Sequence, residues 1–159
     1  MTPVVHLVGY SNSGKTTLMA GLISVFKGRN YNIAAVKHAA HGYTADPPGT
    51  DSWQYAQAGA DHVAIVGPDS YTMHEFGKPD FPLADILAQL NKADLILVEG
   101  FKNAPGPKIE VYRQGISEDR MSWLHPKLAV VSDVPLQEEN WFSFDELEKL
   151  ADFILASVM

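Results

Sequence analysis

The sequence predicts a three-layer α/β fold built on a mostly parallel sheet. Short apolar runs typical of buried strands alternate along the chain with longer segments whose apolar residues recur at helical spacing. The run Leu95 to Val98 has no polar residue, as expected of a central parallel strand that is covered on both faces. A chain of 159 residues can bury a sizeable core in one piece, so we expect a single domain over residues 1–159.

The first part of the chain reads as strand, helix, strand and loop. Val4 to Val8 is an apolar run, and Thr17 to Lys27 has the period of an amphipathic helix that Gly28 can end. Ile33 to Val36 predicts a second strand. The segment Gly42 to Gly49 is rich in Gly and Pro and fits neither period, so we expect an irregular loop there. The apolar face of the first helix comprises Leu18, Met19, Leu22, Ile23 and Phe26.

The middle of the chain predicts a short helix and two strands. Thr50 or Asp51 can cap a helix that ends near Gly59. His62 to Val66 is typical of a third strand, and Tyr71 to Phe76 of an edge or hairpin strand.

The last part of the chain continues the alternation. A further amphipathic helix precedes the run at Leu95, and Ile109 to Tyr112 and Leu128 to Val131 supply two more strands. Ser143 and Glu146 have the spacing of a capping box, which marks the start of a final helix. The apolar residues that mark the first of these two helices are Leu83, Ile86, Leu87 and Leu90, and those that share one face of the last are Leu147, Leu150, Ala151, Ile154 and Val158.

A glycine-rich pattern lies between the first strand and the first helix. Gly9 to Thr16, GYSNSGKT, matches G-x-x-x-x-G-K-T, which is typical of a phosphate-binding loop. In such a loop successive backbone N–H groups point at the β-phosphate, Lys15 reaches the β- and γ-phosphates, and the Thr16 hydroxyl can bind Mg²⁺. A turn that only connects strand and helix is the alternative. The sequence therefore predicts a P-loop NTPase fold with the phosphate ligands Gly9, Ser11, Asn12, Ser13, Gly14, Lys15, Thr16 and Thr17.

The position of a polar residue along its strand decides whether it can reach the nucleotide, because ligands of such sheets bind at the carboxyl ends of the strands. Glu99 ends the buried strand, whereas Asp94 precedes it and lies about 16 Å away at about 3.3 Å per residue. We therefore expect Glu99 to bind Mg²⁺ or its water, with Gly100 leaving room for a γ-phosphate. The alternative is that Glu99 only forms an ion pair with Lys37 or Lys102.

A guanine-recognition string, N-K-x-D, occurs at Asn91 to Asp94 but at the wrong end of its strand. A base bound there would lie at the opposite edge of the sheet from the phosphate loop. Asp133 follows the strand Leu128 to Val131 at the correct edge, and its carboxylate can accept the N1 and N2 hydrogens of guanine, a pair that adenine does not offer. The alternative is a turn aspartate before Pro135.

Four further side chains are candidates for contact with the phosphates. Lys37 can neutralise phosphate charge, and His38 and His41 can donate to a phosphate oxygen, line a second pocket or stay solvated in their loop. Asp51 can hold a Mg²⁺-bound water or act only as a helix N-cap.

Hydrolysis of a bound nucleotide is expected to be slow. Lys15, the loop amides, and Mg²⁺ on Thr16 with Glu99 as its acidic ligand would stabilise charge on the phosphates, but no residue stands out that would orient the attacking water. The chain has three arginines, and none adjoins a recognisable catalytic motif. We therefore expect turnover far below the usual enzyme range of about 1 to 10³ per second.

The composition excludes several classes of partner and site. A formal charge of −7 and a pI near 5.2 argue against nucleic acid and anionic membranes, because both require a basic surface. The absence of cysteine excludes disulfides and thiolate metal sites. No signal peptide is evident, and no apolar run approaches the roughly 20 residues of a membrane span, so we expect a cytoplasmic protein.

Taken together, these motifs resemble the MobB family, molybdopterin-guanine dinucleotide biosynthesis protein B, over nearly the whole chain. At Thr50 the chain has Gly-Thr-Asp-Ser where the family pattern would have Gly-Lys-Asp-Ser, although Asp51 is retained. Besides the phosphate loop and Thr17, the resemblance rests on Val36-Lys37-His38 with His41, Gly49 to Ser52 leading to Ala58-Gly59-Ala60, Asp94 to Lys102 as DLILVEGFK, and Val131 to Leu136 as VSDVPL.

The resemblance implies a homodimer that binds GTP and Mg²⁺, hydrolyses GTP weakly, and assists a nucleotidyltransferase in attaching GMP to molybdopterin. Such proteins look like adapters rather than the transferase itself. Tyr71 to Phe76 and Ile109 to Tyr112 are the candidate edge strands for pairing between two subunits.

Two other classes share the phosphate loop. A small-molecule kinase usually needs a cationic lid over the transferred phosphoryl group, and three arginines are few for one. A nucleotide-gated metal-delivery protein would need cysteines or a histidine-rich tract to carry its metal. A nucleotide-dependent interaction module without chemistry of its own is the remaining alternative.

Overall fold

The computed structural model describes residues 2–77 and 81–159, which form two compact units. The main unit joins Met1–His38 to Leu83–Met159, and the inserted unit is the intervening Ala39–Pro82. The prediction of one domain over residues 1–159 stays a prediction. Within the described part of the chain, no helix is long and apolar enough to cross a bilayer.

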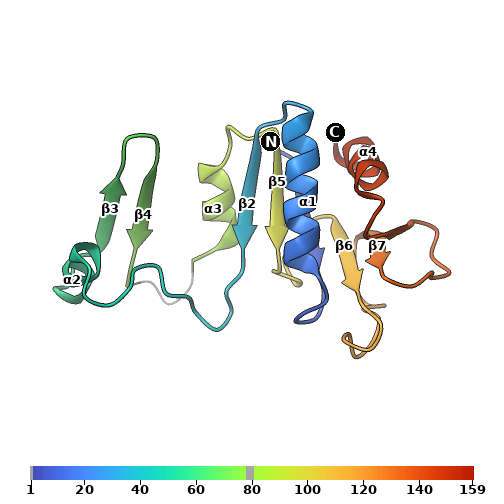
Figure 1. Cartoon of the computed structure of the whole chain (residues 1–159), viewed down its shortest axis with the longest axis horizontal. Coiled ribbons are helices and arrows are strands. Elements are labelled where there is room, and N and C mark those ends of the chain that lie inside the picture. The colour runs from blue at the N-terminus through green and yellow to red at the C-terminus, as the bar shows by residue number, and fades with distance from the viewer. Residues whose placement is uncertain (1, 78–80) are drawn as a thin grey trace. The chain divides into compact units, whose positions relative to one another are not determined.

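The elements follow the predicted order (Figure 1). The main unit contains β1 (Val4–Val8), α1 (Lys15–Gly28), β2 (Ile33–Lys37), α3 (Leu83–Gln89), β5 (Leu95–Glu99), β6 (Lys108–Tyr112), β7 (Lys127–Ser132), β8 (Trp141–Ser143) and α4 (Leu147–Val158). The inserted unit contains α2 (Asp51–Gln57), β3 (His62–Val66) and β4 (Tyr71–Glu75).

The sheet of the main unit has the strand order β2-β5-β1-β6-β7-β8, and each neighbouring pair is parallel. In Figure 1 the arrows of β2, β5 and β6 accordingly point the same way. Parallel strands bring their carboxyl ends to one edge of the sheet, so Lys37 and Glu99, the last residues of β2 and β5, are register partners. The predicted α/β fold is confirmed.

Two helices, α1 and α4, pack together and cover one face of this sheet. Alternate strand residues point to them, because successive side chains of a strand face opposite sides. Leu22 and Phe26 of α1 are fully buried, and each such side chain stabilises the fold by about 2 kcal/mol. The strand residues of this core are Val5, Leu7, Leu95, Leu97, Ile109, Val111, Ala129 and Val131.

The opposite face is covered by α3 and by the connection between β6 and β7. Ile96 and Leu87 border a small cavity of about 300 Å³ between sheet and helix, and Val8 packs against Met121 and Leu124. Since both faces of β5 are covered, all its side chains are buried, as the apolar run Leu95 to Val98 predicts.

Three features of the main unit differ from the sequence prediction. Ile109–Tyr112 was expected to be an edge strand, which is wrong, because β6 lies between β1 and β7. The edge strand β8 was not predicted, since three residues are too few to show a period of two. The capping box predicted a helix start at Ser143, but α4 begins at Leu147 with Glu146 as its N-cap. One bond of the box is present, since the Glu146 carboxylate accepts the Ser143 N–H at 3.0 Å.

The inserted unit consists of a short helix and a hairpin. Thr50 is the N-cap of α2, and its hydroxyl accepts the Trp53 N–H at 3.4 Å. Strands β3 and β4 pair antiparallel, which confirms Tyr71 as the start of a hairpin strand. Among the described residues of this unit, Val63 is the one buried apolar side chain.

Candidate functional site

The phosphate loop leaves β1 and turns directly into α1. Asn12 and Gly14 have left-handed backbone angles, φ 61° and 101°, which turn the chain back onto the helix. Gly14 is the N-cap of α1 and offers no side-chain oxygen to its first turn. The N–H groups of that turn are therefore left for a ligand, and the helix dipole favours an anion. The helix begins at Lys15, two residues before the predicted start.

Gly9 is required where the loop passes β6. A Cβ atom at this position would lie 2.3 Å from the carbonyl oxygen of Val111 and 2.7 Å from Ser13 Oγ. Ser13 Oγ is itself buried, without a hydrogen-bond partner among the residues that the structure describes. The loop is thus packed directly on the backbone of β6.

Lys15 lies back across the loop. Its Nζ donates to the carbonyl oxygens of Gly9 at 3.0 Å and Tyr10 at 2.6 Å. Burial lowers the pKa of Lys15, and the charge of Lys37 lowers it further, whereas Glu99 opposes both. A phosphate would offer Lys15 a full negative charge in place of two backbone carbonyls, which strengthens its hydrogen bonds.

Thr16 and Glu99 meet at the carboxyl edge of the sheet. The Thr16 hydroxyl lies 3.2 and 3.1 Å from the two carboxylate oxygens of Glu99 and donates to them. Lys37 Nζ lies 3.6 Å from Glu99 Oε1, so the ion pair considered from the sequence is present as well. A hydroxyl and a carboxylate are hard oxygen ligands of the kind that Mg²⁺ prefers.

These residues line one cavity of about 400 Å³ in the main unit. Three cations border it, Lys15, Lys37 and Arg113, with Glu99 as the opposing acid. The predicted ligands that line it are Ser11, Asn12, Gly14, Lys15, Thr16, Thr17, Lys37 and Glu99.

Arg113 was not predicted to belong to this site, because it adjoins no recognisable motif in the sequence, but the fold brings it to the lining of this cavity. Its guanidinium lies 5.4 Å from the centroid of the Phe144 ring, and its Nε is buried without a hydrogen-bond partner in the described chain. The backbone is fixed by a turn in which Ser117 Oγ accepts the Arg113 N–H at 3.1 Å. The signal was present in the sequence, because Arg113 directly follows a predicted strand at its carboxyl end.

His38 and Gly100 lie beside the cavity but do not line it. A Cβ on Gly100 would lie 2.9 Å from the Cβ of His38, so the missing side chain makes room for the histidine. The His38 ring stacks on Phe101, with centroids 4.2 Å apart. Contact of either residue with a γ-phosphate stays a prediction.

Asp133 and Asp51 stay outside the cavity lining too. Asp133 follows β7 at the expected edge, where its Oδ1 accepts the Gln114 N–H at 2.9 Å. Asp51 is the first residue of α2 in the inserted unit and follows the Thr50 cap. Its predicted part in Mg²⁺ binding stays a prediction, as does that of His41 in the same unit.

The guanine string at Asn91 to Asp94 has a structural role at the opposite edge. Asp94 Oδ2 accepts the Asn32 N–H at 2.7 Å, and the Lys92 carbonyl accepts from the Asn32 side chain at 2.9 Å. This position before β5 agrees with the expectation that the string does not bind the base.

Comparison with known proteins places this chain in a family. The family model described as molybdopterin guanine dinucleotide synthesis protein B, MobB, matches residues 4–133. The chain belongs to the MobB family. The molybdopterin-guanine dinucleotide biosynthesis adapter protein of Haemophilus influenzae is 35% identical over 157 residues, covering 96% of this chain and 87% of its own length. That of Escherichia coli is 34% identical over 164 residues, covering 98% and 93%.

Solved MobB structures share the fold. A crystal structure of molybdopterin-guanine biosynthesis protein B superposes with a TM-score of 0.76 and 29% identity, covering 97% of both chains. MobB of Bacillus subtilis gives a TM-score of 0.72 and 26% identity, covering 99% of this chain and 98% of its own. The resemblance found in the sequence is therefore confirmed.

Proposed function

We propose that this MobB-family chain is a GTP-binding adapter in the synthesis of molybdopterin guanine dinucleotide. The observation that carries the proposal is the cavity at the phosphate loop, where Lys15, Lys37 and Arg113 surround an uncapped helix start. Such a site suits the phosphates of a nucleotide. The names of the two relatives support the biosynthetic context.

The strand order indicates how a bound nucleotide would be oriented, with its phosphates and its base toward different strands. Glu99 ends β5 on one side of the phosphate loop, whereas Asp133 follows β7 on the other. With Mg²⁺ on Thr16 and Glu99, the β- and γ-phosphates lie toward β5, and the base lies toward Asp133. Arg113 follows β6, which separates the loop from β7. It is therefore placed for the α-phosphate or the ribose, the part of GTP that becomes GMP.

The role of the chain is that of an adapter with slow hydrolysis. Arg113 supplies a cation in the same chain, but no described side chain in the cavity is set to orient an attacking water, so we keep the expectation of weak GTP turnover. A partner nucleotidyltransferase would carry out the attachment of GMP to molybdopterin. The MobB-family chain would hold GTP and Mg²⁺ for it.

We also propose that the protein is a homodimer formed through the hairpin of the inserted unit. Val66, Tyr71 and Met73 share one face of the hairpin, and their exposed fractions are 80%, 72% and 64%. A two-stranded hairpin is marginally stable alone in water, and this face has the apolar character of an interface. Light scattering at micromolar concentration tests the dimer, and a monomer would contradict it.

Titration calorimetry with GTP and ATP in the presence of Mg²⁺ tests the nucleotide site. We expect GTP to bind more tightly than ATP, and Lys15→Ala to weaken GTP binding by roughly 100-fold, since it removes a charged hydrogen-bond donor to phosphate. Lys27→Ala is the matched control, because Lys27 lies exposed in the last turn of the same helix. No GTP binding by the wild type, or equal binding by Lys15→Ala, would contradict the proposal.

A further inference from the structure

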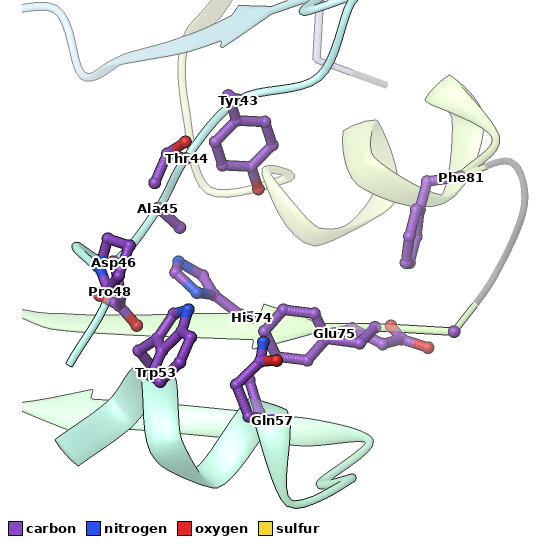
Figure 2. A pocket seen from close by; sticks show the side chains of 13 residues that line it. Tyr43, Thr44, Ala45, Asp46, Pro48, Trp53, Gln57, His74, Glu75 and Phe81 are labelled. Atoms are coloured by element: carbon purple, nitrogen blue, oxygen red, sulfur yellow. The ribbon is translucent and has the colours of Figure 1, made fainter. Parts of the chain in front are cut away.

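A second cavity, of about 610 Å³, lies wholly within the inserted unit (Figure 2). It is bordered by the loop before α2, by α2 itself, and by β4 with the residues that follow it. Its size falls in the range of about 300–1,000 Å³ that is typical of small-molecule sites. The nucleotide site accounts for none of its lining residues, because that site belongs to the main unit.

Aromatic side chains from separate segments border the cavity. Tyr43 comes from the loop, Trp53 from α2, Phe76 from the end of β4 and Phe81 from the start of the next segment. Figure 2 shows Tyr43 and Trp53 on opposite sides of the cavity and Phe81 toward its far end. Faces of this kind favour a flat ring system, because stacking on an aromatic side chain is worth about 1–3 kcal/mol per heterocycle.

Polar side chains lie at the Trp53 end of the same cavity. Asp46, His74 and Trp53 are half-buried, and Gln57 directs its amide from α2 toward the space above Trp53 (Figure 2). Asp46 is followed by two prolines, which restrict the backbone that carries it. His74 is held by an edge-to-face contact with Phe76, with centroids 6.0 Å apart. A carboxylate, an amide and an imidazole thus surround the place where a flat ring would stack.

We propose that this cavity binds the pterin ring of molybdopterin, an inference that rests on the proposed function. A pterin carries a 2-amino group next to a ring N3–H, so that two parallel donors face outward. A single carboxylate accepts such a pair, and Asp46 supplies it. The pterin carbonyl accepts from the Gln57 amide, and the ring stacks on Trp53. The phosphate of molybdopterin extends away from the cavity, since Asp46 would repel it.

Fluorescence titration with pterin and with lumazine tests this site. Lumazine has the same bicyclic ring but an oxygen in place of the 2-amino group, so it lacks one of the donors for Asp46. We expect pterin to bind the wild-type chain roughly tenfold more tightly than lumazine, because lumazine lacks one hydrogen bond to the charged Asp46. Asp46→Asn removes that preference, and Trp53→Ala weakens both ligands by roughly tenfold.

Two control variants match these changes outside the cavity. Asp69→Asn removes an acid from the turn between β3 and β4, and Trp123→Ala removes an exposed tryptophan of the main unit. Both should bind pterin as the wild type does. Far-UV circular dichroism checks that each variant keeps its fold, and the comparison of pterin with lumazine on the wild type needs no variant.

The outcomes separate this inference from the nucleotide proposal. Absence of pterin binding, equal binding of pterin and lumazine, or loss of pterin binding in Lys15→Ala would overturn the inference, the last because it would place pterin at the phosphate loop. If GTP still binds in those cases, the nucleotide site stands. If pterin binds as expected and GTP does not, the proposed nucleotide function fails while the pterin site is retained.

Discussion

The guanidinium of Arg113 lies over the ring of Phe144, 5.4 Å from its centroid, at the cavity that the phosphate loop lines. The two residues follow different strands, β6 and β8, which are separated by β7 in the sheet. A cation on an aromatic face gains about 0.5–2 kcal/mol, so the contact holds the guanidinium in place before any ligand arrives.

Arg113→Ala should weaken the binding of GMP, GDP and GTP by about the same factor, roughly tenfold, because Arg113 is placed for the part that the three nucleotides share. Lys15→Ala should instead weaken binding by a factor that grows from GMP to GDP to GTP, because Lys15 is placed for the β- and γ-phosphates. Calorimetry with the three nucleotides measures both patterns. Arg29→Ala, which removes an arginine bonded to Glu148 and Asp152 elsewhere on the main unit, is the control. An Arg113→Ala loss that grows with phosphate number would contradict this placement.

Asp133→Asn should reduce the preference for GTP over ATP by roughly tenfold while leaving the fold intact. An amide keeps one oxygen to accept the Gln114 N–H, as Asp133 Oδ1 does at 2.9 Å, but it replaces the second acceptor by a donor. Competition between GTP and ATP measures the ratio. An unchanged ratio would mean that Asp133 only stabilises its turn.

Glu99→Gln should abolish the effect of Mg²⁺ on GTP affinity. The substitution removes the charged oxygen ligand beside Thr16, and Mg²⁺ depends on carboxylates for its few protein contacts. Binding of GTP with and without Mg²⁺ measures the difference in wild type and variant. Glu118→Gln, an exposed acid outside the cavity lining, should behave as the wild type does. A Mg²⁺ effect that survives in Glu99→Gln would refute a metal role for this carboxylate.

Gly9→Ala and Gly28→Ala should change stability in opposite directions. A Cβ on Gly9 meets the Val111 carbonyl at 2.3 Å, so the loop must shift, at a cost of about 2 kcal/mol or more. A Cβ on Gly28, at the end of α1, meets no atom within 4 Å and should add about 0.5–1 kcal/mol. Urea denaturation measures the free energy of unfolding of both variants. Equal midpoints would contradict the packing of the loop on β6.

The acid stability of the protein should depend on Glu110. This buried carboxylate accepts from the Met121 N–H at 2.7 Å and from Arg120 at 3.0 and 2.9 Å. Burial alone would raise the pKa of Glu110, but these bonds and the charges of Arg120 and Lys127 bring it below its ordinary value of 4.5. Because the folded-state pKa is depressed, the stabilisation is complete above about pH 4.5 and is lost as the pH falls through the folded-state pKa.

Glu110→Gln should therefore cost about 2 kcal/mol near neutral pH, because it removes the buried charged acceptor of Arg120 and Lys127 and leaves them only the half-buried Glu138. The difference in the free energy of unfolding between variant and wild type should become smaller in acid, where the carboxylate of Glu110 is protonated and neutral like the amide of the variant. Urea denaturation at several pH values measures it. A gap that stays constant down to about pH 3 would show that the ionised form of Glu110 contributes nothing.

The sequence was sufficient for the order of the elements and for the strand that carries the phosphate loop. The strand Leu95 to Val98 could be predicted because a central parallel strand is apolar without interruption. The position of Glu99 at the site followed from the rule that ligands bind at the carboxyl ends of the strands. The neighbours of each strand could not be predicted in this way. Strand order depends on long-range packing, which is why Ile109 to Tyr112 was mistaken for an edge.

The same limit explains the residues that were missed at the site. Phe144 follows β8, a strand too short to be recognised, and only the sheet order brings it beside Gly14 and Arg113. The cavity of the inserted unit combines Asp46, Trp53 and His74 from three separate segments, and no local pattern marks them as neighbours.

Gly9 packs against the Val111 carbonyl so closely that the phosphate loop and β6 have no space for a side chain between them. Two residues beyond Val111, the chain reaches Arg113 and the tight turn closed by Ser117. Loop, strand and turn are therefore in direct contact one after the other, so we expect a displacement at the turn to shift the phosphate loop as well.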